Sequence, residues 1–146
     1  MRALTWMGYV STVLCLIAAH DRAIAQAKHV DLELVLAVDV SRSMDIEEQQ
    51  LQRDGYAAAF RHPEVVSAIA SGPLGRIAVT YVEWAGPNVQ TVVVPWTIIA
   101  GESSALAFSD KIATTAIARE RGTSISGGLD FASRLFAESG VQGLRR

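Results

Sequence analysis

Three oxygen-bearing side chains, Asp39, Ser41 and Ser43, stand at alternate positions where a long apolar run ends. The run covers residues 32–38 and is polar only at Glu33, as expected for a strand buried on both faces of a parallel sheet. In open α/β sheets, ligands gather at the carboxyl ends of such strands. A carboxylate and two hydroxyls are hard ligands that suit Mg²⁺ or another oxygen-seeking cation. The sequence therefore predicts a cation whose charge is only partly neutralised, so that it can attract an acidic group.

The plainer alternative is a polar strand end at which Ser43 only caps the next helix, a common role for serine. Asp-x-Ser-x-Ser alone occurs often by chance. Its position between a buried strand and a predicted helix makes the pattern more selective and favours the cation.

Residues 38–44, Val-Asp-Val-Ser-Arg-Ser-Met, closely resemble the first loop of the metal-ion-dependent adhesion site (MIDAS) in von Willebrand factor type A (VWA) domains. The wider context also resembles a bacterial exported subgroup of that family to which no function is assigned. The resemblance implies an α/β fold with a Rossmann-like open sheet of the VWA kind.

Residues 122–126, Gly-Thr-Ser-Ile-Ser, resemble the second metal loop of that family, in which a glycine-threonine pair begins a helix. Taken alone, Thr123 would be an ordinary helix N-cap. Together with the first loop, the resemblance implies a Mg²⁺ (or Mn²⁺ or Ca²⁺) held by Ser41, Ser43 and Thr123. Asp39 would assist through water, and a carboxylate of an acidic protein or other ligand would complete the coordination.

The family's third metal loop carries an aspartate after the next strand, and the sequence reaches Arg146 before such a strand. We therefore expect residues 28–146 to be the N-terminal part of a VWA-like domain, truncated after the third strand and the helices that follow it. The family's strand order, 3-2-1-4-5-6, would then leave residues 34–38 as an open hydrophobic edge. We expect the 146-residue chain to be unstable or to aggregate alone, or to be a fragment of a longer reading frame.

An enzyme is the rival class. Residues 122–126 lack the last glycine of Gly-x-Ser-x-Gly, and no histidine lies downstream to act as a base. Asp39-Val-Ser41 superficially suggests a phosphatase nucleophile, but the second aspartate, which would act as a general acid, is replaced by Ser41. We therefore expect a binding protein and no enzyme, unless a missing C-terminal part supplies the catalysis. The alternatives are a metal-dependent hydrolase, such as a phosphoesterase, and a truncated remnant that binds nothing.

A helix over residues 45–60 should follow the first loop, because Asp45 and Glu48 have the spacing of a capping box. Pro63 should break it, and residues 64–70 are expected to form a further short helical turn. Mostly small residues at helical spacing predict the face that lies on the sheet: Leu51, Gly55, Ala58 and Ala59.

Two strands are predicted at residues 76–85 and 89–99, and the short turn between them implies antiparallel pairing. Pro95 lacks a backbone donor and fits an edge strand. Glu83, near the end of the first of these strands, is expected at a solvated position, with an approach to the outer shell of the metal as the alternative.

Two further helices are predicted, over residues 105–118 after a cap at Ser103 or Ser104, and from Thr123 or Ser124 to about Glu138. In the first helix the buried candidates are Leu106, Ile112 and Ala116. In the second the apolar stripe is Ile125, Leu129, Ala132, Leu135 and Phe136.

The N-terminus has the layout of a secretory signal peptide: Arg2, an apolar stretch, and small residues before a cleavage site after Ala25 or Ala27. An uncleaved membrane anchor is the alternative, but the stretch is short for a span of ~20 residues. The chain would thus divide into a signal peptide, 1–27, and one domain, 28–146, that is periplasmic or secreted and has no stable membrane span.

The composition bounds the remaining function classes. The chain is 50% hydrophobic with a net charge of −2, and its basic residues are scattered, so no nucleic-acid partner is expected. Its single cysteine, Cys15, lies within the predicted signal peptide, so the mature chain would have no disulfide.

Overall fold

The computed structural model describes residues 28–146. The predicted signal peptide, with its cleavage after Ala25 or Ala27, lies outside these residues. Within the described part, no helix combines the length and the hydrophobicity needed to cross a membrane. The elements are β1 (Lys28–Val30), β2 (Leu32–Asp39), α2 (Ile46–Arg61), α3 (Pro63–Ala70), β3 (Ile77–Trp84), β4 (Gln90–Ile99), α4 (Glu102–Thr114), α5 (Ile125–Glu138) and β5 (Val141–Gly143).

The main sheet has the strand order β2-β3-β4, with β2 parallel to β3 and β3 antiparallel to β4. The predicted antiparallel hairpin is therefore confirmed, and Pro95 lies in an edge strand as expected. Among the described strands β2 pairs only with β3, so residues 34–38 lie at the other edge, as expected. β1 and β5 pair in parallel as a separate two-stranded sheet.

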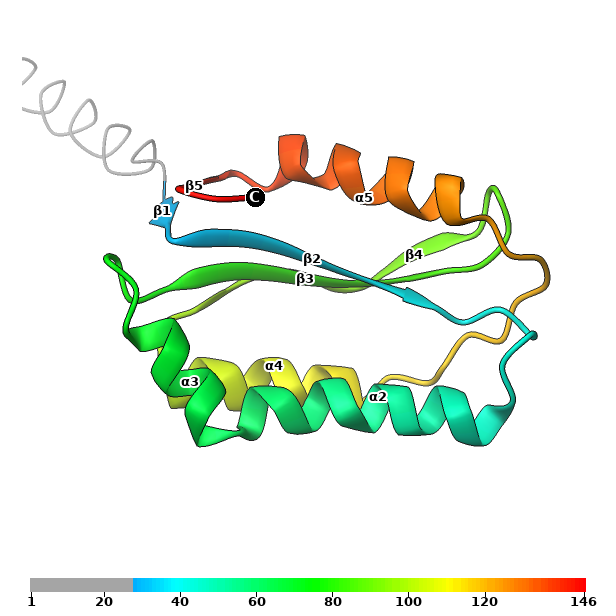
Figure 1. The fold of residues 1–146 in the computed structure, drawn as a ribbon, viewed down its shortest axis with the longest axis horizontal. Helices are drawn as coiled ribbons and strands as arrows, with labels where there is room; N and C mark the ends of the chain where they lie inside the picture. The colour runs from blue at the N-terminus through cyan, green and yellow to red at the C-terminus, as the bar shows by residue number, and fades with distance from the viewer. Residues whose placement is uncertain (1–27) are drawn as a thin grey trace, which may run out of the picture.

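Helices cover both faces of the main sheet: α5 lies on one face, and α2, α3 and α4 lie on the other (Figure 1). The central strand, β3, is buried at every position except its last. Alternate side chains of β3 point to opposite faces of the sheet and contact the helices there. Tyr81 packs edge-on against Tyr56 of α2, whereas Trp84 faces Gly128 of α5. This mixed α/β arrangement is compatible with the predicted Rossmann-like open sheet.

The inner face of α2 differs from the prediction. The helix begins with Asp45 as N-cap and with the predicted capping box to Glu48. Leu51 is 74% exposed, and nothing lies near the position of a Cβ at Gly55, so the predicted small-residue face is wrong. The residues that α2 buries are Gln49, Arg53, Ala57 and Phe60. The helix is rotated because two long polar side chains find partners in the interior.

The packing face of α5 also differs. The helix starts after its N-cap, Ser124, as predicted, but Ile125 and Leu129 are each 65% exposed. The face that it buries contains Gly128, Ala132 and Leu135. A Cβ at Gly128 would lie 2.8 Å from the Trp84 ring, so the helix backbone rests directly on the indole. That close approach sets the rotation of the helix and turns its first two large apolar side chains outward.

The helix α4 is displaced from its predicted bounds. It begins after Gly101 without a side-chain cap bond, and it ends at Thr114, four residues before the predicted end. Ile112 is buried as predicted, but Leu106 and Ala116 are exposed. The early end frees residues 115–124 to cross to the carboxyl edge of the sheet.

Candidate metal centre

The first predicted loop folds into a tight turn directly after β2. The backbone N–H of Ser41 donates to Asp39 Oδ1 at 2.7 Å, and the hydroxyls of Ser41 and Ser43 lie 2.7 Å apart. Ser41 is buried whereas Ser43 is exposed, so the hydroxyl pair reaches from the interior to the surface. The turn thus brings the predicted carboxylate and both predicted hydroxyls into one small group.

Ser43 is not the N-cap of the next helix. Asp45 has that role: its Oδ1 accepts from the Glu48 N–H at 2.8 Å, and Glu48 Oε2 accepts from the Asp45 N–H at 3.0 Å. The plainer alternative for Ser43, a helix cap, is therefore not what the structure shows. Its hydroxyl is paired with Ser41 instead.

The second predicted loop returns to the same edge of the sheet, beside the first (Figure 1). The Glu120 N–H donates to the Val40 carbonyl at 3.3 Å, and the Arg42 N–H donates to the Glu120 carbonyl at 3.0 Å. A few residues on, the Ser124 N–H donates to the carbonyl of Ala85 at 2.7 Å, just past the end of β3. Thr123 lies between these two anchors and is exposed. The structure therefore brings the backbone segment of Thr123 to the edge where Asp39, Ser41 and Ser43 lie.

Glycine allows this close approach of the two loops. Gly122 adopts a φ of +81°, which favours glycine, and it packs against Gly86 in the turn after β3. A Cβ at Gly86 would lie 3.0 Å from the carbonyl oxygen of Arg121. The N-cap of α5 is Ser124, whose hydroxyl accepts from the Gly127 N–H at 3.2 Å. Thr123 therefore does not take the capping role that it would have by itself.

The candidate ligands at this edge are hydroxyl groups and a single carboxylate, that of Asp39. No group of three or more His, Cys, Asp or Glu side chains in residues 28–146 is arranged to hold a metal. In octahedral Mg²⁺ coordination at ~2.1 Å, neighbouring oxygen ligands lie about 3 Å apart. The Ser41 and Ser43 hydroxyls, at 2.7 Å, are within a few tenths of an ångström of that separation. The donor set therefore fits a hard cation.

A buried ion pair lies behind the two loops. Arg53 of α2 is bonded to Glu83 of β3, and both side chains are 2% exposed. The prediction of a solvated Glu83 is therefore wrong. Glu83 points to the α2 face of the sheet, where the guanidinium compensates its charge; an uncompensated carboxylate would be costly there.

Gln49 and Arg53 were not among the residues predicted to support the site. Gln49 is 2% exposed, and its Nε2 donates to the carbonyl of Ser41 at 2.9 Å. The available signal was their spacing: both fall on the helical face that Ala57 and Phe60 continue. A prediction that expects only apolar or small residues to be buried does not find this face, because two of its four residues are long and polar.

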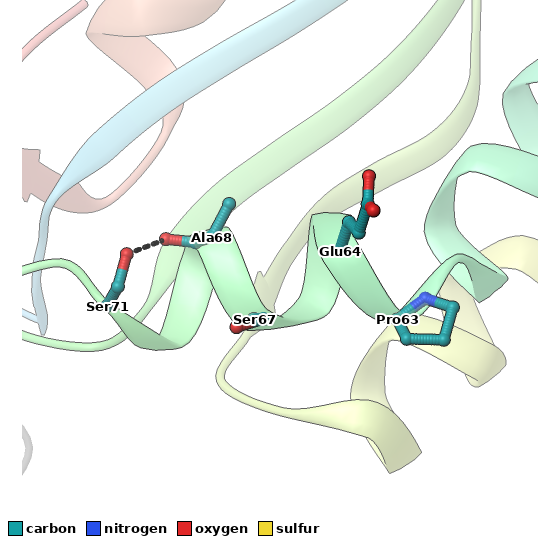
Figure 2. Close-up of a pocket in the computed structure, with 5 residues that line it drawn as sticks. All are labelled: Pro63, Glu64, Ser67, Ala68 and Ser71. Atoms are coloured by element: carbon teal, nitrogen blue, oxygen red, sulfur yellow. Dashed lines mark hydrogen bonds between the residues drawn. The ribbon is translucent and has the colours of Figure 1, made fainter.

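Two other polar features lie away from this edge. Burial raises the pKa of the Glu33 carboxyl, but hydrogen bonds from the Gly143 N–H and the Arg146 guanidinium outweigh it and hold this pKa below its usual value. Figure 2 shows a shallow depression along α3, lined by Pro63, Glu64, Ser67, Ala68 and Ser71. It is an open groove along a single helix at the opposite end of the sheet and adds nothing to the site.

A family model described as "Protein of unknown function (DUF1194)" matches residues 29–146. The chain belongs to this DUF1194 family. The matched range contains both loops and the buried pair behind them. Among curated proteins, none matches the chain.

Proposed function

We propose that residues 28–146 form an exported binding domain that holds a divalent cation at the carboxyl edge of the sheet and, through it, an acidic ligand. The cation would be Mg²⁺, or Mn²⁺ or Ca²⁺. Ser41, Ser43 and Thr123 would hold it, with Asp39 assisting through water, as in the MIDAS of the VWA domains that the sequence resembles.

The observation that carries the proposal is the hydroxyl pair of Ser41 and Ser43, 2.7 Å apart beside the Asp39 carboxylate. Hydroxyls add no negative charge, so one carboxylate would leave a bound divalent cation with a net positive charge. The helices α2 and α5 both begin at this edge, and the positive ends of their dipoles also favour an anionic partner. These features support a protein or other ligand that supplies a carboxylate.

Calorimetry of Mg²⁺ binding, with three variants, tests the site. Asp39→Ala, Ser43→Ala and Thr123→Val should each weaken binding at least about tenfold, in the range seen when metal sites lose supporting groups. The matched controls are Ser103→Ala, at the exposed start of α4, and Thr97→Val, a partly exposed residue of β4 that pairs with Val79 in the first half of β3. Both positions lie toward the opposite end of the sheet, and both variants should bind as the unaltered chain does.

Equal Mg²⁺ affinity in all three site variants and both controls would refute these ligands. Turnover of a phosphate ester that requires Mg²⁺ and is abolished by Asp39→Ala would instead indicate the metal-dependent hydrolase. Fractionation of cells that express the full chain tests export, since a cytoplasmic product would contradict it.

A further inference from the structure

We propose that Gln49 and Arg53, one turn apart on the buried face of α2, are positioning residues that fix the two cation loops relative to each other. The inference rests on the proposed function and deepens it, because it assigns a mechanism that sets the geometry of that same site. Neither side chain is placed as a ligand. Each acts through the backbone of one loop.

Gln49 fixes the first loop. The carbonyl of Ser41 accepts from Gln49 Nε2 at 2.9 Å and from the Met44 N–H at 3.2 Å. The N–H of Ser41 is bonded to Asp39, and its hydroxyl is paired with that of Ser43. Each polar group of Ser41 is therefore held, and the bond from Gln49 is the one that connects the loop to a rigid helix.

Arg53 fixes the start of the segment that carries Thr123. Its guanidinium donates to the carbonyls of Ile112, at 2.9 Å, and Thr115, and it is paired with Glu83. The second carboxylate oxygen of Glu83 accepts from the Ala118 N–H at 3.4 Å. The segment 115–124 is thus held first by this pair and only then by the first loop and the turn after β3.

Both contacts are internal to the protein, and both come from one face of one helix. The first half of α2 therefore sets the position of both loops. A shift of this half would displace both loops together, whereas loss of one contact would displace one loop alone. Mg²⁺ demands near-ideal octahedral geometry, while Ca²⁺ accepts a flexible and larger ligand shell. Positioning should therefore matter more for Mg²⁺ than for Ca²⁺, which a general loss of stability would not reproduce.

The test uses the full chain and two variants, Gln49→Met and the double variant Arg53→Met/Glu83→Met. Both keep side-chain volume and leave no unpaired charge in the interior. The matched controls are Gln50→Met, on the exposed face of α2, and Arg61→Met/Asp110→Asn, which removes an exposed ion pair between α2 and α4. The measurements are Mg²⁺ and Ca²⁺ affinities and the amide exchange of residues 115–121 without cation.

Both variants should lose about 10–100-fold in Mg²⁺ affinity, the range for outer groups of metal sites, and distinctly less in Ca²⁺ affinity. The double variant should also exchange the amides of residues 115–121 faster, while both controls behave as the unaltered chain. If the unaltered chain binds Mg²⁺ and the variants bind it equally well, the inference is overturned and the proposed function stands. If the unaltered chain binds no cation, the proposed function fails, and unchanged exchange in the double variant would overturn the positioning role as well.

Discussion

Removing one partner of the Arg53–Glu83 pair should cost far more than removing both. In Arg53→Met, the Glu83 carboxylate remains 2% exposed with no compensating charge, and breaking a buried pair in this way costs about 3–5 kcal/mol. A domain of this size has a total free energy of unfolding of about 5–15 kcal/mol. The single variant should therefore lose a large share of its stability.

Arg53→Met/Glu83→Met removes the uncompensated charge and replaces the pair with side chains of similar volume. Such replacements are often neutral or stabilising. The carbonyl of Ile112 loses a bond, which costs about 1–3 kcal/mol if it stays buried, while Thr115 is exposed and can bond to water. We expect a net loss of about 1–2 kcal/mol, so the second substitution should restore part of what the first removed.

Urea unfolding of the single variants, the double variant and the unaltered chain gives this comparison directly, provided that the slopes agree. Arg61→Met is the control, because its pair with Asp110 is exposed and should contribute less than about 1 kcal/mol. It also removes a bond from Arg61 to the Ser109 hydroxyl, which keeps its own bond to the carbonyl of Ala57. Equal losses in Arg53→Met and in the double variant would mean that the charge of Glu83 is solvated after all. The buried pair would then not exist in solution.

Two further predictions concern packing and pH. Gly128→Ala should destabilise the fold by about 1–3 kcal/mol, because its Cβ would meet the Trp84 ring. Gly55→Ala should stabilise it by up to about 1 kcal/mol, because nothing lies near the added Cβ. Thermal unfolding that ranks the two variants the other way would contradict the packing of α5. Since the pKa of Glu33 is lowered by folding, its carboxylate stabilises the protein above the ordinary value of 4.5, and this stability is lost as pH falls through the folded pKa. Glu33→Gln should therefore be less stable than the unaltered chain near neutral pH, and urea unfolding should show the difference shrinking as the pH falls below 4.5. A difference that stays constant would exclude this linkage.

Features set by neighbouring residues were predictable from the sequence. The capping box of Asp45 and Glu48 and the N-cap at Ser124 depend on spacings within one helical turn, and the structure has both. The hairpin of β3 and β4 follows from a short turn between two β-rich segments. Local pattern was sufficient in each case because the partners are close in the chain.

Features set by distant partners were not predictable in this way. Glu83 is buried because Arg53, thirty residues earlier, reaches it across the layer between α2 and the sheet. The rotation of α5 depends on the contact of Gly128 with Trp84, which exists only once the sheet has formed. The apolar stripe beginning at Ile125 predicted the helix correctly but its buried face wrongly. Gly128 lies on the buried face, and a glycine contributes nothing to hydrophobic periodicity.

The two halves of α2 show where folding and the proposed function diverge. Its second half buries Ala57 and Phe60 in the core, as an amphipathic helix should, whereas its first half buries Gln49 and Arg53. Burying polar side chains there costs desolvation free energy that apolar side chains would not, so core packing alone does not account for Gln49 and Arg53. What distinguishes the first half is its place: it lies behind the loops after β2 and before α5, and each polar side chain ends on a backbone group of one of them. A local departure from the folding pattern, at the edge where the candidate ligands gather, is where a functional constraint is expected.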